Sequence, residues 1–262
     1  KRKEKIGIGA MNTKGLIKNK HEEKSYLNLL ENILQNGSLR QDRTKIGTLS
    51  IFGSNLRFSL KNNTLPMLTT KKMFSKGVIE ELLFFIRGDT DTKKLEEKGV
   101  NIWKGNTSRE FLDSRKLFHI KDGDMGKGYG YQWRNFGAVD VGHQTYRGVD
   151  QLPGVIDSIK NDPYGRRHII TAWNPNDLNE VSLPPCHILV QFYVDNGELS
   201  SQFYMRSVDT FLGLPFNVMS YAILTHLIAK ATNLKAKEIV FCGGDTHIYS
   251  NHIEQVKEQI TR

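Results

Sequence analysis

The segment from Phe216 to Ala231 is apolar around nearly its whole circumference when it is drawn as a helix. A surface helix has one apolar stripe, so a helix of this kind has to be enclosed by other elements. The chain has 262 residues, enough for one large domain to enclose it. Asn217 lies near the start of this helix, and a buried amide needs partners. It is either a structural polar residue, which is the commoner case, or a residue that reads a ligand.

Other periodic segments supply the enclosing layers. Helical spacing of apolar residues predicts helices from Tyr26 to Leu34, from Val78 to Ile86 and from Leu152 to Ile159, and Asn36-Gly37 should end the first in a left-handed conformation. Alternating segments predict strands at 48–52, 55–60, 166–173, 187–194, 198–205 and 238–242, with a bend at the glycine between the first two. No internal repeat is present. We expect one α+β domain with a large mixed or antiparallel sheet covered by helices.

A thiol and a guanidinium are predicted at the same end of one hairpin. The turn Asp195-Asn196-Gly197 joins strands 187–194 and 198–205, so Cys186 before the first strand comes close to Arg206 after the second. A cysteine attacks only as the thiolate, and a nearby guanidinium lowers the pKa of a thiol. The arrangement is typical of an activated nucleophile beside an anion site. The alternative, commoner for a lone cysteine, is a small buried hydrophobic side chain.

A carboxylate and two groups of cationic or aromatic residues add to the candidate site. Glu81 lies on the apolar side of helix 78–86, where it is either paired with a cation or held for proton transfer. Residues 104–150 are rich in glycine and contain Tyr129 and other aromatics, as loops that line ligand clefts often do. Arg166-Arg167 opens a strand, which usually means exposure to solvent, although two guanidiniums could clamp a phosphate.

The composition excludes several classes of protein. Residues 1–20 hold seven Lys or Arg and one Glu, so they carry +6 of the net +9, and we interpret them as a solvated basic arm rather than a nucleic-acid site. Without a stretch of membrane-spanning length, a signal peptide or a disulfide framework, the expected location is cytoplasmic. The histidines and two cysteines lack metal-ligand spacing, and the glycines at 123, 126, 128 and 130 form no nucleotide fingerprint. We expect no metal.

A set of short motifs follows in order along the chain. The second half contains Pro184-Pro185-Cys186-His187, Gln191-Phe192-Tyr193-Val194, Arg206-Ser207, Leu212-Gly213-Leu214-Pro215-Phe216-Asn217 and Gly244-Asp245-Thr246-His247-Ile248-Tyr249-Ser250-Asn251-His252. The first half contains Asp42-Arg43-Thr44, Thr69-Thr70-Lys71, Glu81-Leu82-Leu83-Phe84-Phe85, Gly88-Asp89-Thr90, Ile102-Trp103 and Tyr129-Gly130-Tyr131-Gln132-Trp133-Arg134. Together, over roughly residues 21–262, they resemble the thymidylate synthase family.

The resemblance implies a methyltransferase that converts dUMP to dTMP, with 5,10-methylenetetrahydrofolate as donor of the carbon and the hydride. Cys186 would add as thiolate to carbon 6 of uracil, assisted by Arg206. Glu81 and Tyr129, with waters, would move the proton from carbon 5. Asn217 would read O4 and N3 of uracil, whereas an aspartate there would suit cytosine, as in the related dCMP hydroxymethylases.

The resemblance also implies the binding residues. The dUMP phosphate would be held by Arg43, Arg206 and Ser207 and, across a homodimer whose interface is one face of the sheet, by Arg166 and Arg167 of the partner subunit. His247 and Tyr249 would bind the ribose 3′-hydroxyl. Folate would contact Trp103 by stacking and Asp209 by hydrogen bonds.

The two ends of the chain complete the expected organisation. Residues 6–12 and 15–17 faintly resemble the opening strand of dihydrofolate reductase, as in a reductase-like remnant or linker of a bifunctional reductase-synthase chain. The alternative, which we prefer, is that residues 1–20 are an unstructured basic extension. Residues 21–262 would form the synthase domain without the C-terminal segment that closes over folate in this family. The alternatives are a dCMP hydroxymethylase-like enzyme, an inactive or truncated dUMP-binding relative, and a nucleic-acid-binding module.

Overall fold

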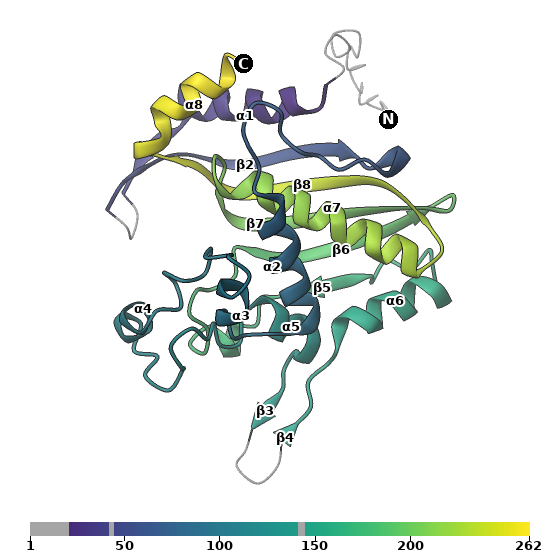
Figure 1. Cartoon of the computed structure of the whole chain (residues 1–262). Helices are drawn as coiled ribbons and strands as arrows, with labels where there is room; N and C mark the ends of the chain where they lie inside the picture. The colour runs from purple at the N-terminus through teal and green to yellow at the C-terminus, as the bar shows by residue number, and fades with distance from the viewer. Residues whose placement is uncertain (1–20, 42–44, 141–144) are drawn as a thin grey trace, which may run out of the picture.

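The computed structural model describes residues 21–41, 45–140 and 145–262, and these fold around one six-stranded sheet (Figure 1). The strand order is β1-β2-β8-β7-β6-β5, and every neighbouring pair is antiparallel except β7 with β8. The bounds are β1 Ser38–Arg40, β2 Thr48–Ser59, β5 Ile169–Thr171, β6 His187–Asp195, β7 Glu198–Asp209 and β8 Lys235–Tyr249. A separate ribbon pairs β3 Val139–Asp140 with β4 Thr145–Tyr146. The prediction of an α+β domain with a mixed sheet is confirmed.

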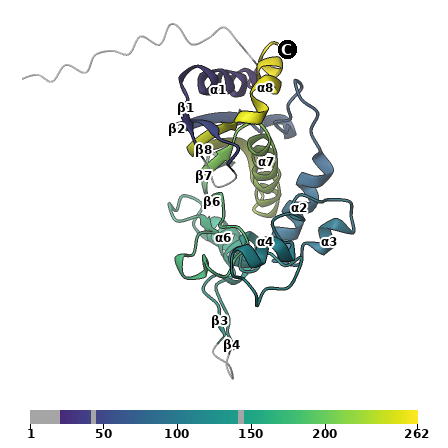
Figure 2. The same cartoon turned by 90° about the vertical axis from the view of Figure 1, so that its left-hand side faces the viewer.

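The helices are α1 Glu23–Asn36, α2 Ser75–Arg87, α3 Lys93–Glu96, α4 Arg109–Ser114, α5 Tyr129–Asn135, α6 Gln151–Asn161, α7 Gly213–Ala231 and α8 Ile253–Ile260, with the 3-10 turns η2 Lys61–Asn63, η3 Pro175–Asp177 and η4 Ser250–His252. In Figure 2, α7 and α2 lie on the same side of the sheet, while α1 and α8 lie together near the β1–β2 edge. The predicted enclosure of α7 is confirmed, because its side chains from Leu214 to Ala229 are largely buried.

α7 is fixed to the sheet by contacts from alternate residues of β7. The Phe203 ring stacks on Tyr221 of α7 with centroids 4.4 Å apart, and the hydroxyls of Ser201 and Thr225 lie 2.6 Å apart. Because alternate strand residues share a face, residues 201, 203, 205, 207 and 209 of β7 all face the helical layer. This assigns one face of the sheet to α7.

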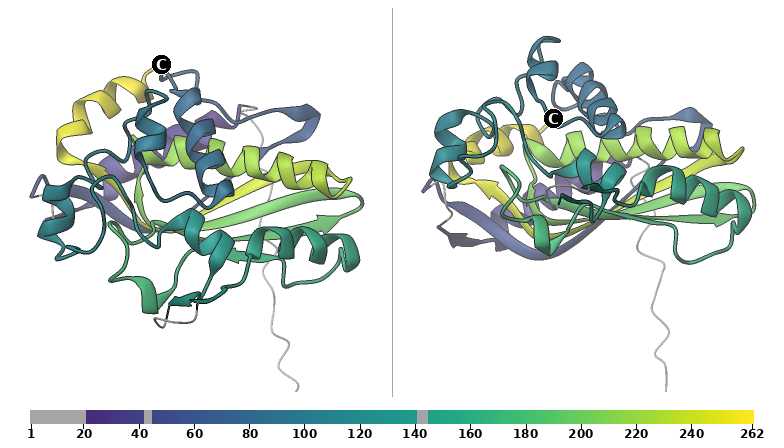
Figure 3. Two further views of the ribbon diagram at one scale, coloured as in Figure 1. Left: turned by 60° about the horizontal axis from the view of Figure 1, so that its bottom comes forward. Right: turned by 90° about the horizontal axis from the view of Figure 1, so that it is seen from below.

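The two faces of the sheet differ in polarity and burial, as two adjacent rows of residues across five strands show. On the α7 side the row is wholly apolar and buried: Leu56, Phe241, Phe203, Val190 and Ile170. One residue further along, the row on the other side is Arg57, Val240, Gln202, Gln191 and Ile169, in which only Val240 is buried. Within the described residues, no helix covers this second face over β2, β8 and β7 (Figures 2 and 3).

Three predicted boundaries differ from the structure. Gly37 is extended rather than left-handed, and it has to be glycine because a side chain there would collide with the carbonyl oxygen of Ile33. The two strands predicted around Gly53 form the single strand β2, in which only Gly53 itself adopts a positive φ. β8 does not end before Gly243-Gly244 but continues to Tyr249, because flanking strands pair with it on both sides.

Candidate active site

Cys186 and Arg206 meet at the open end of the β6–β7 hairpin. The backbone N–H of Arg206 donates to the carbonyl oxygen of Cys186 at 2.9 Å. The guanidinium is held by the two residues before the cysteine, because Nε donates to the carbonyl oxygen of Pro185 and Nη2 to that of Pro184, both at 2.8 Å. It also lies 5.5 Å from the ring centroid of Trp173. The cation is thus fixed beside the segment that carries the half-buried thiol.

Tyr129 connects α5 to this segment. Its hydroxyl oxygen accepts from the backbone N–H of Cys186 at 2.8 Å. The ring lies between Phe85, with centroids 4.9 Å apart, and His187, at 4.2 Å. Burial, together with the charges of Cys186 and Glu81, raises the pKa of the phenol well above its usual value, so the hydroxyl stays neutral. The Gly-rich region was expected to be loop, but Tyr129 opens a helix there.

Glu81 of α2 is partnered by an uncharged donor. The indole N–H of Trp103 donates to Glu81 Oε1 at 2.7 Å, and among the described residues no cation forms an ion pair with this carboxylate. Burial raises the pKa of Glu81 to about 7, against a smaller lowering by the indole hydrogen bond. A pKa near neutrality lets a carboxyl group both take up and release a proton. The interpretation of Glu81 as half of a core ion pair is therefore excluded.

The sequence interpretation missed His187 and Tyr221. His187 pairs with Met205 of β7 and so faces the α7 side, where its Nδ1 lies 2.8 Å from the Tyr221 hydroxyl. Burial lowers the pKa of His187 to about 3 and raises that of Tyr221, so both rings are neutral at physiological pH. Strand alternation counted back from Val190 would have placed His187 on the opposite face, and it is the β-bulge between His187 and Leu189 that turns the imidazole toward α7. Stacked on Tyr129, the neutral imidazole fixes the position of that phenol.

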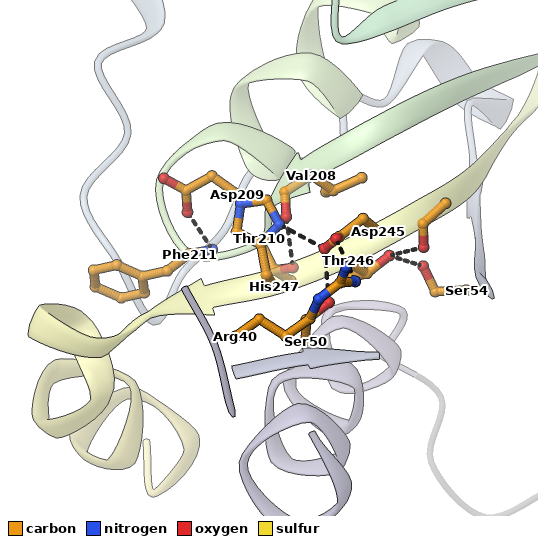
Figure 4. A network of polar contacts seen from close by, with 11 residues as sticks. Arg40, Ser50, Ser54, Val208, Asp209, Thr210, Phe211, Asp245, Thr246 and His247 are labelled. Carbon is orange, nitrogen blue, oxygen red and sulfur yellow. Dashed lines mark hydrogen bonds and ion pairs between the residues drawn. The ribbon is translucent and has the colours of Figure 1, made fainter. Parts of the chain in front are cut away.

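Four of the residues predicted to bind phosphate, folate or ribose share one face of β7 and β8: Ser207, Asp209, His247 and Tyr249. Ser207 pairs with Asp245, Asp209 pairs with His247, and Tyr249 follows two positions later on β8. Paired and alternate strand residues point to the same side, which here is the α7 side. The His247 and Tyr249 rings lie 5.3 Å apart at 89°. Figure 4 shows Asp209, Asp245 and His247 together in one network of polar contacts.

Asn217 and Asp209 lie on either side of Gly213. Asp209 Oδ1 accepts from the backbone N–H groups of Phe211 and Leu212 at 3.2 and 3.0 Å, which fixes the entry into α7. The side chain of Asn217 is half-buried, and no described residue hydrogen-bonds its amide. A Cβ at Gly213 would be 3.6 Å from Asp209 Cβ and 3.7 Å from Asn217 Oδ1. The two polar groups therefore border the same small space, and the amide is available to a ligand.

Not all of the predicted arginines lie near Cys186 in the structure. Arg166 and Arg167 are exposed and precede β5. β5 runs antiparallel to β6, with Ile169 opposite Gln191, so the two arginines lie near the far end of β6, about 20 Å along the strand from Cys186. Within one chain they do not reach the thiol. Arg43 lies outside the described residues.

The loop before Tyr129 is fixed by contacts of Lys127. Lys127 N donates to the carbonyl oxygen of Glu180 at 2.8 Å, and Lys127 Nζ lies 3.1 Å from Asp177 Oδ1. The buried Asp177 carboxylate also accepts from Gln132 and Asn174. The hydrogen bond and the charge of Asp177 raise the pKa of Lys127 against the lowering effect of burial. An ion pair and two amides thus hold the loop that carries Tyr129.

A cavity of about 380 Å³ lies apart from these residues, between α1, the η2 turn and the start of α7, and its lining includes Tyr26, Met67 and Pro215. Among the residues that the structure describes, no group of three His, Cys, Asp or Glu could hold a metal ion. In the same residues, no helix has the length and apolar character needed to cross a membrane.

Comparison with known proteins finds one family over almost the whole chain. A sequence model of the thymidylate synthase family matches residues 24–262. The chain is 52% identical over 251 residues to the bifunctional dihydrofolate reductase-thymidylate synthase of Zea mays, covering 94% of this chain and 48% of that protein. It is 53% identical to a probable thymidylate synthase of Schizosaccharomyces pombe (92% and 40% covered) and 52% identical to the thymidylate synthase of human herpesvirus 8 (92% and 72%). The chain thus spans about half the length of the bifunctional relatives it matches.

Proposed function

The chain belongs to the thymidylate synthase family, and from that premise we propose that it converts dUMP to dTMP with 5,10-methylenetetrahydrofolate as donor of the carbon and the hydride. The observation that carries the proposal is the meeting of Cys186, Arg206 and Tyr129 at one end of the β6–β7 hairpin. A thiol, a cation and a neutral phenol suit nucleophilic addition to an anionic, electron-poor substrate.

Cys186 supplies the nucleophile. Its thiolate adds to carbon 6 of the uracil ring, and the electron pair moves through carbon 5 to O4 as an enolate. Carbon 5 then bonds to the folate methylene, a proton leaves carbon 5, and the amine of tetrahydrofolate departs. Hydride transfer from tetrahydrofolate to the methylene carbon gives the methyl group and dihydrofolate, and the sulfur leaves carbon 6. The guanidinium of Arg206, held at Pro184 and Pro185, favours the thiolate at the start.

Glu81 and Tyr129 handle the proton at carbon 5. With its pKa near 7, Glu81 exchanges protons with water bound between it and the substrate. Tyr129 stays neutral and places a hydroxyl next to the cysteine segment. Trp103 lies between the two groups, because its indole N–H donates to Glu81 and its ring centroid is 5.7 Å from that of Tyr129.

Asn217 reads the base. Its amide can donate to O4 and accept from N3–H of uracil, and no described residue competes for these bonds. Cytosine has a donor at carbon 4 and an unprotonated N3, so it presents the opposite pattern. The proposal therefore favours dUMP over dCMP, and no observation supports the hydroxymethylase alternative.

Phosphate binding needs a second copy of the chain. Arg206 and Ser207 are adjacent residues of β7 at the cysteine end of the hairpin, whereas Arg166 and Arg167 are too far along β6 to act within their own subunit. The sheet face without helices offers a surface through which a homodimer brings Arg166 and Arg167 of the partner subunit to the phosphate. Several guanidiniums around a dianion give charge-assisted binding.

Folate lies against Trp103 and Asp209. Trp103 is nearly buried and uses its indole N–H for Glu81, so only part of its ring can contact a pterin. Asp209 retains Oδ2 for hydrogen bonds, since Oδ1 already accepts from two backbone N–H groups. The bond between Trp103 and Glu81 couples folate binding to the group that handles the proton.

The proposal is tested by incubating the purified protein with dUMP and methylenetetrahydrofolate. We expect dihydrofolate formation, measured by absorbance, and equal release of tritium from [5-³H]dUMP. Cys186→Ser should abolish both, whereas Cys242→Ser, which changes the other free thiol, should retain them. Faster turnover of dCMP than of dUMP would overturn the assignment of the substrate.

A further inference from the structure

Asp245, two residues before His247 on the same face of β8, accepts hydrogen bonds from side chains of three strands. Its Oδ1 lies 2.7 Å from Ser50 Oγ of β2 and 3.0 Å from His247 Nδ1 of β8, and its Oδ2 lies 3.1 Å from Arg40 Nη1 of β1 (Figure 4). Ser50 pairs directly with His247 across β2 and β8, so all of these groups are set by strand register. None of the predicted roles used Asp245, Ser50 or Arg40.

This arrangement decides which ring nitrogen of His247 carries the proton. An ionised carboxylate only accepts hydrogen bonds, so the contact with Asp245 Oδ1 requires a proton on Nδ1. In the neutral imidazole, Nε2 is then left with a lone pair. No described residue bonds Nε2, and the His247 side chain is 9% exposed. The imidazole therefore offers an acceptor, not a donor, to whatever lies next to it.

The three donors are not equally important. The Arg40–Asp245 ion pair is largely exposed, with 60% of the arginine side chain accessible, and such pairs contribute little in water. Ser50 is buried, and its hydroxyl bonds the same oxygen that His247 uses. Ser50 therefore holds Oδ1 in place for the imidazole, while Arg40 adds only a weak contact to Oδ2.

We propose that Asp245 is a positioning residue that holds His247 in the Nδ1–H tautomer, so that Nε2 accepts the hydrogen bond of the ribose 3′-hydroxyl. This inference rests on the proposed function, because it assumes that dUMP binds with its sugar at His247. It adds a rule of specificity: the ligand must bring a hydroxyl donor at this carbon. A sugar with hydrogen or an ether oxygen at the 3′ position loses the bond, because His247 has no proton to offer there.

The test compares two ligands and two proteins. Binding of dUMP and of 2′,3′-dideoxyuridine monophosphate, which lacks the 3′-hydroxyl, is measured by calorimetry on the wild type and on Asp245→Ala. We expect Asp245→Ala to weaken dUMP binding about tenfold, as for loss of one oriented hydrogen bond, and to leave binding of the dideoxy ligand within about twofold. The KM for dUMP should rise while kcat changes little. Equal weakening of both ligands would mean a merely structural role and would overturn the proposal.

A spectroscopic readout tests the tautomer directly. In ¹⁵N-histidine-labelled protein, long-range ¹H–¹⁵N correlations of His247 should show a protonated Nδ1 and an unprotonated Nε2, and Asp245→Ala should lose this pattern. Ser50→Ala should weaken the preference more than Arg40→Gln. A protonated Nε2 in the wild type would contradict the proposal.

The binding measurements separate this proposal from the proposed function. If the wild type does not bind dUMP at all, the proposed function fails. If the wild type binds dUMP and the dideoxy ligand equally well, only the role of His247 and Asp245 is refuted.

Discussion

The hydroxyl oxygen of Tyr129 accepts a hydrogen bond from the backbone N–H of Cys186 at 2.8 Å, which ties the first residue of α5 to the residue before β6. The bond joins positions 57 residues apart in the chain. It places a neutral phenol beside the segment that carries the thiol, and any movement of α5 is therefore transmitted to Cys186.

Tyr129→Phe should reduce both stability and turnover. The ring contacts with Phe85 and His187 remain, but the N–H of Cys186 loses its acceptor, so the free energy of unfolding should fall by about 1–2 kcal/mol. The value of kcat should fall more than the affinity for dUMP, because the hydroxyl acts on the reacting segment. Urea unfolding and steady-state kinetics measure both effects. Tyr164→Phe, at an exposed tyrosine, is the control and should change neither.

Glu81→Gln should make the protein more stable at neutral and alkaline pH while it loses activity. Burial raises the pKa of Glu81 from 4.5 to about 7, so between these values the folded protein keeps a proton that the unfolded chain has released. The free energy of unfolding of the wild type therefore falls as pH rises through this range, by about 3 kcal/mol from this group. Glutamine removes the effect.

Urea unfolding at several pH values tests this expectation. The stability difference between Glu81→Gln and the wild type should be absent below pH 4.5 and should reach its full size above about 7. Glu97→Gln, at an exposed glutamate, should show no such dependence. A difference that is constant over the whole pH range would contradict the burial of an ionisable Glu81.

Trp103→Phe should move the pH profile of the enzyme upward. The indole N–H lowers the pKa of Glu81 by bonding its Oε1, so removal of this donor raises that pKa further. The apparent pKa of the rising limb of kcat against pH should increase, and the KM for folate should rise as well. An unchanged pH profile would show that Glu81 does not control the proton step.

Lys127→Met should destabilise the loop before Tyr129. The change leaves the Asp177 carboxylate, which is only 10% exposed, without its cation, although Gln132 and Asn174 still donate to it. Because Lys127 itself is about one-third exposed, we expect a loss of about 1–2 kcal/mol rather than the larger value of a fully buried pair. Thermal unfolding measures this. Lys121→Met, at an exposed lysine, should have no effect.

Local patterns were sufficient to predict much of the fold. The apolar circumference of α7 and the apolar spacing in α2 predicted both helices to within a few residues of their bounds in the structure. Gly88, with φ 73°, ends α2 as predicted. The end of β8 could not be predicted in this way. Gly243-Gly244 has the local composition of a turn, and only its pairing with β2 and β7 keeps it extended.

The same distinction applies to the site. Hairpin geometry was enough to bring Cys186 near Arg206, because the two are adjacent through one turn. The partner of Glu81 lies 22 residues away, and that of Lys127 lies 50 residues away, so these contacts depend on how separate loops fold back. Arg166 lies away from Cys186 within its own chain, so its predicted role belongs to the proposed homodimer and to no local pattern.

The most direct test of the account is covalent trapping with 5-fluoro-dUMP and methylenetetrahydrofolate, followed by intact mass measurement and peptide mapping. Fluorine at carbon 5 cannot leave as a proton does, so the reaction should stop with nucleotide and folate both attached. We predict one adduct per chain on Cys186, present in Cys242→Ser and absent in Cys186→Ser. An adduct that persists in Cys186→Ser, or protein that binds both ligands without forming one, would contradict the central claim.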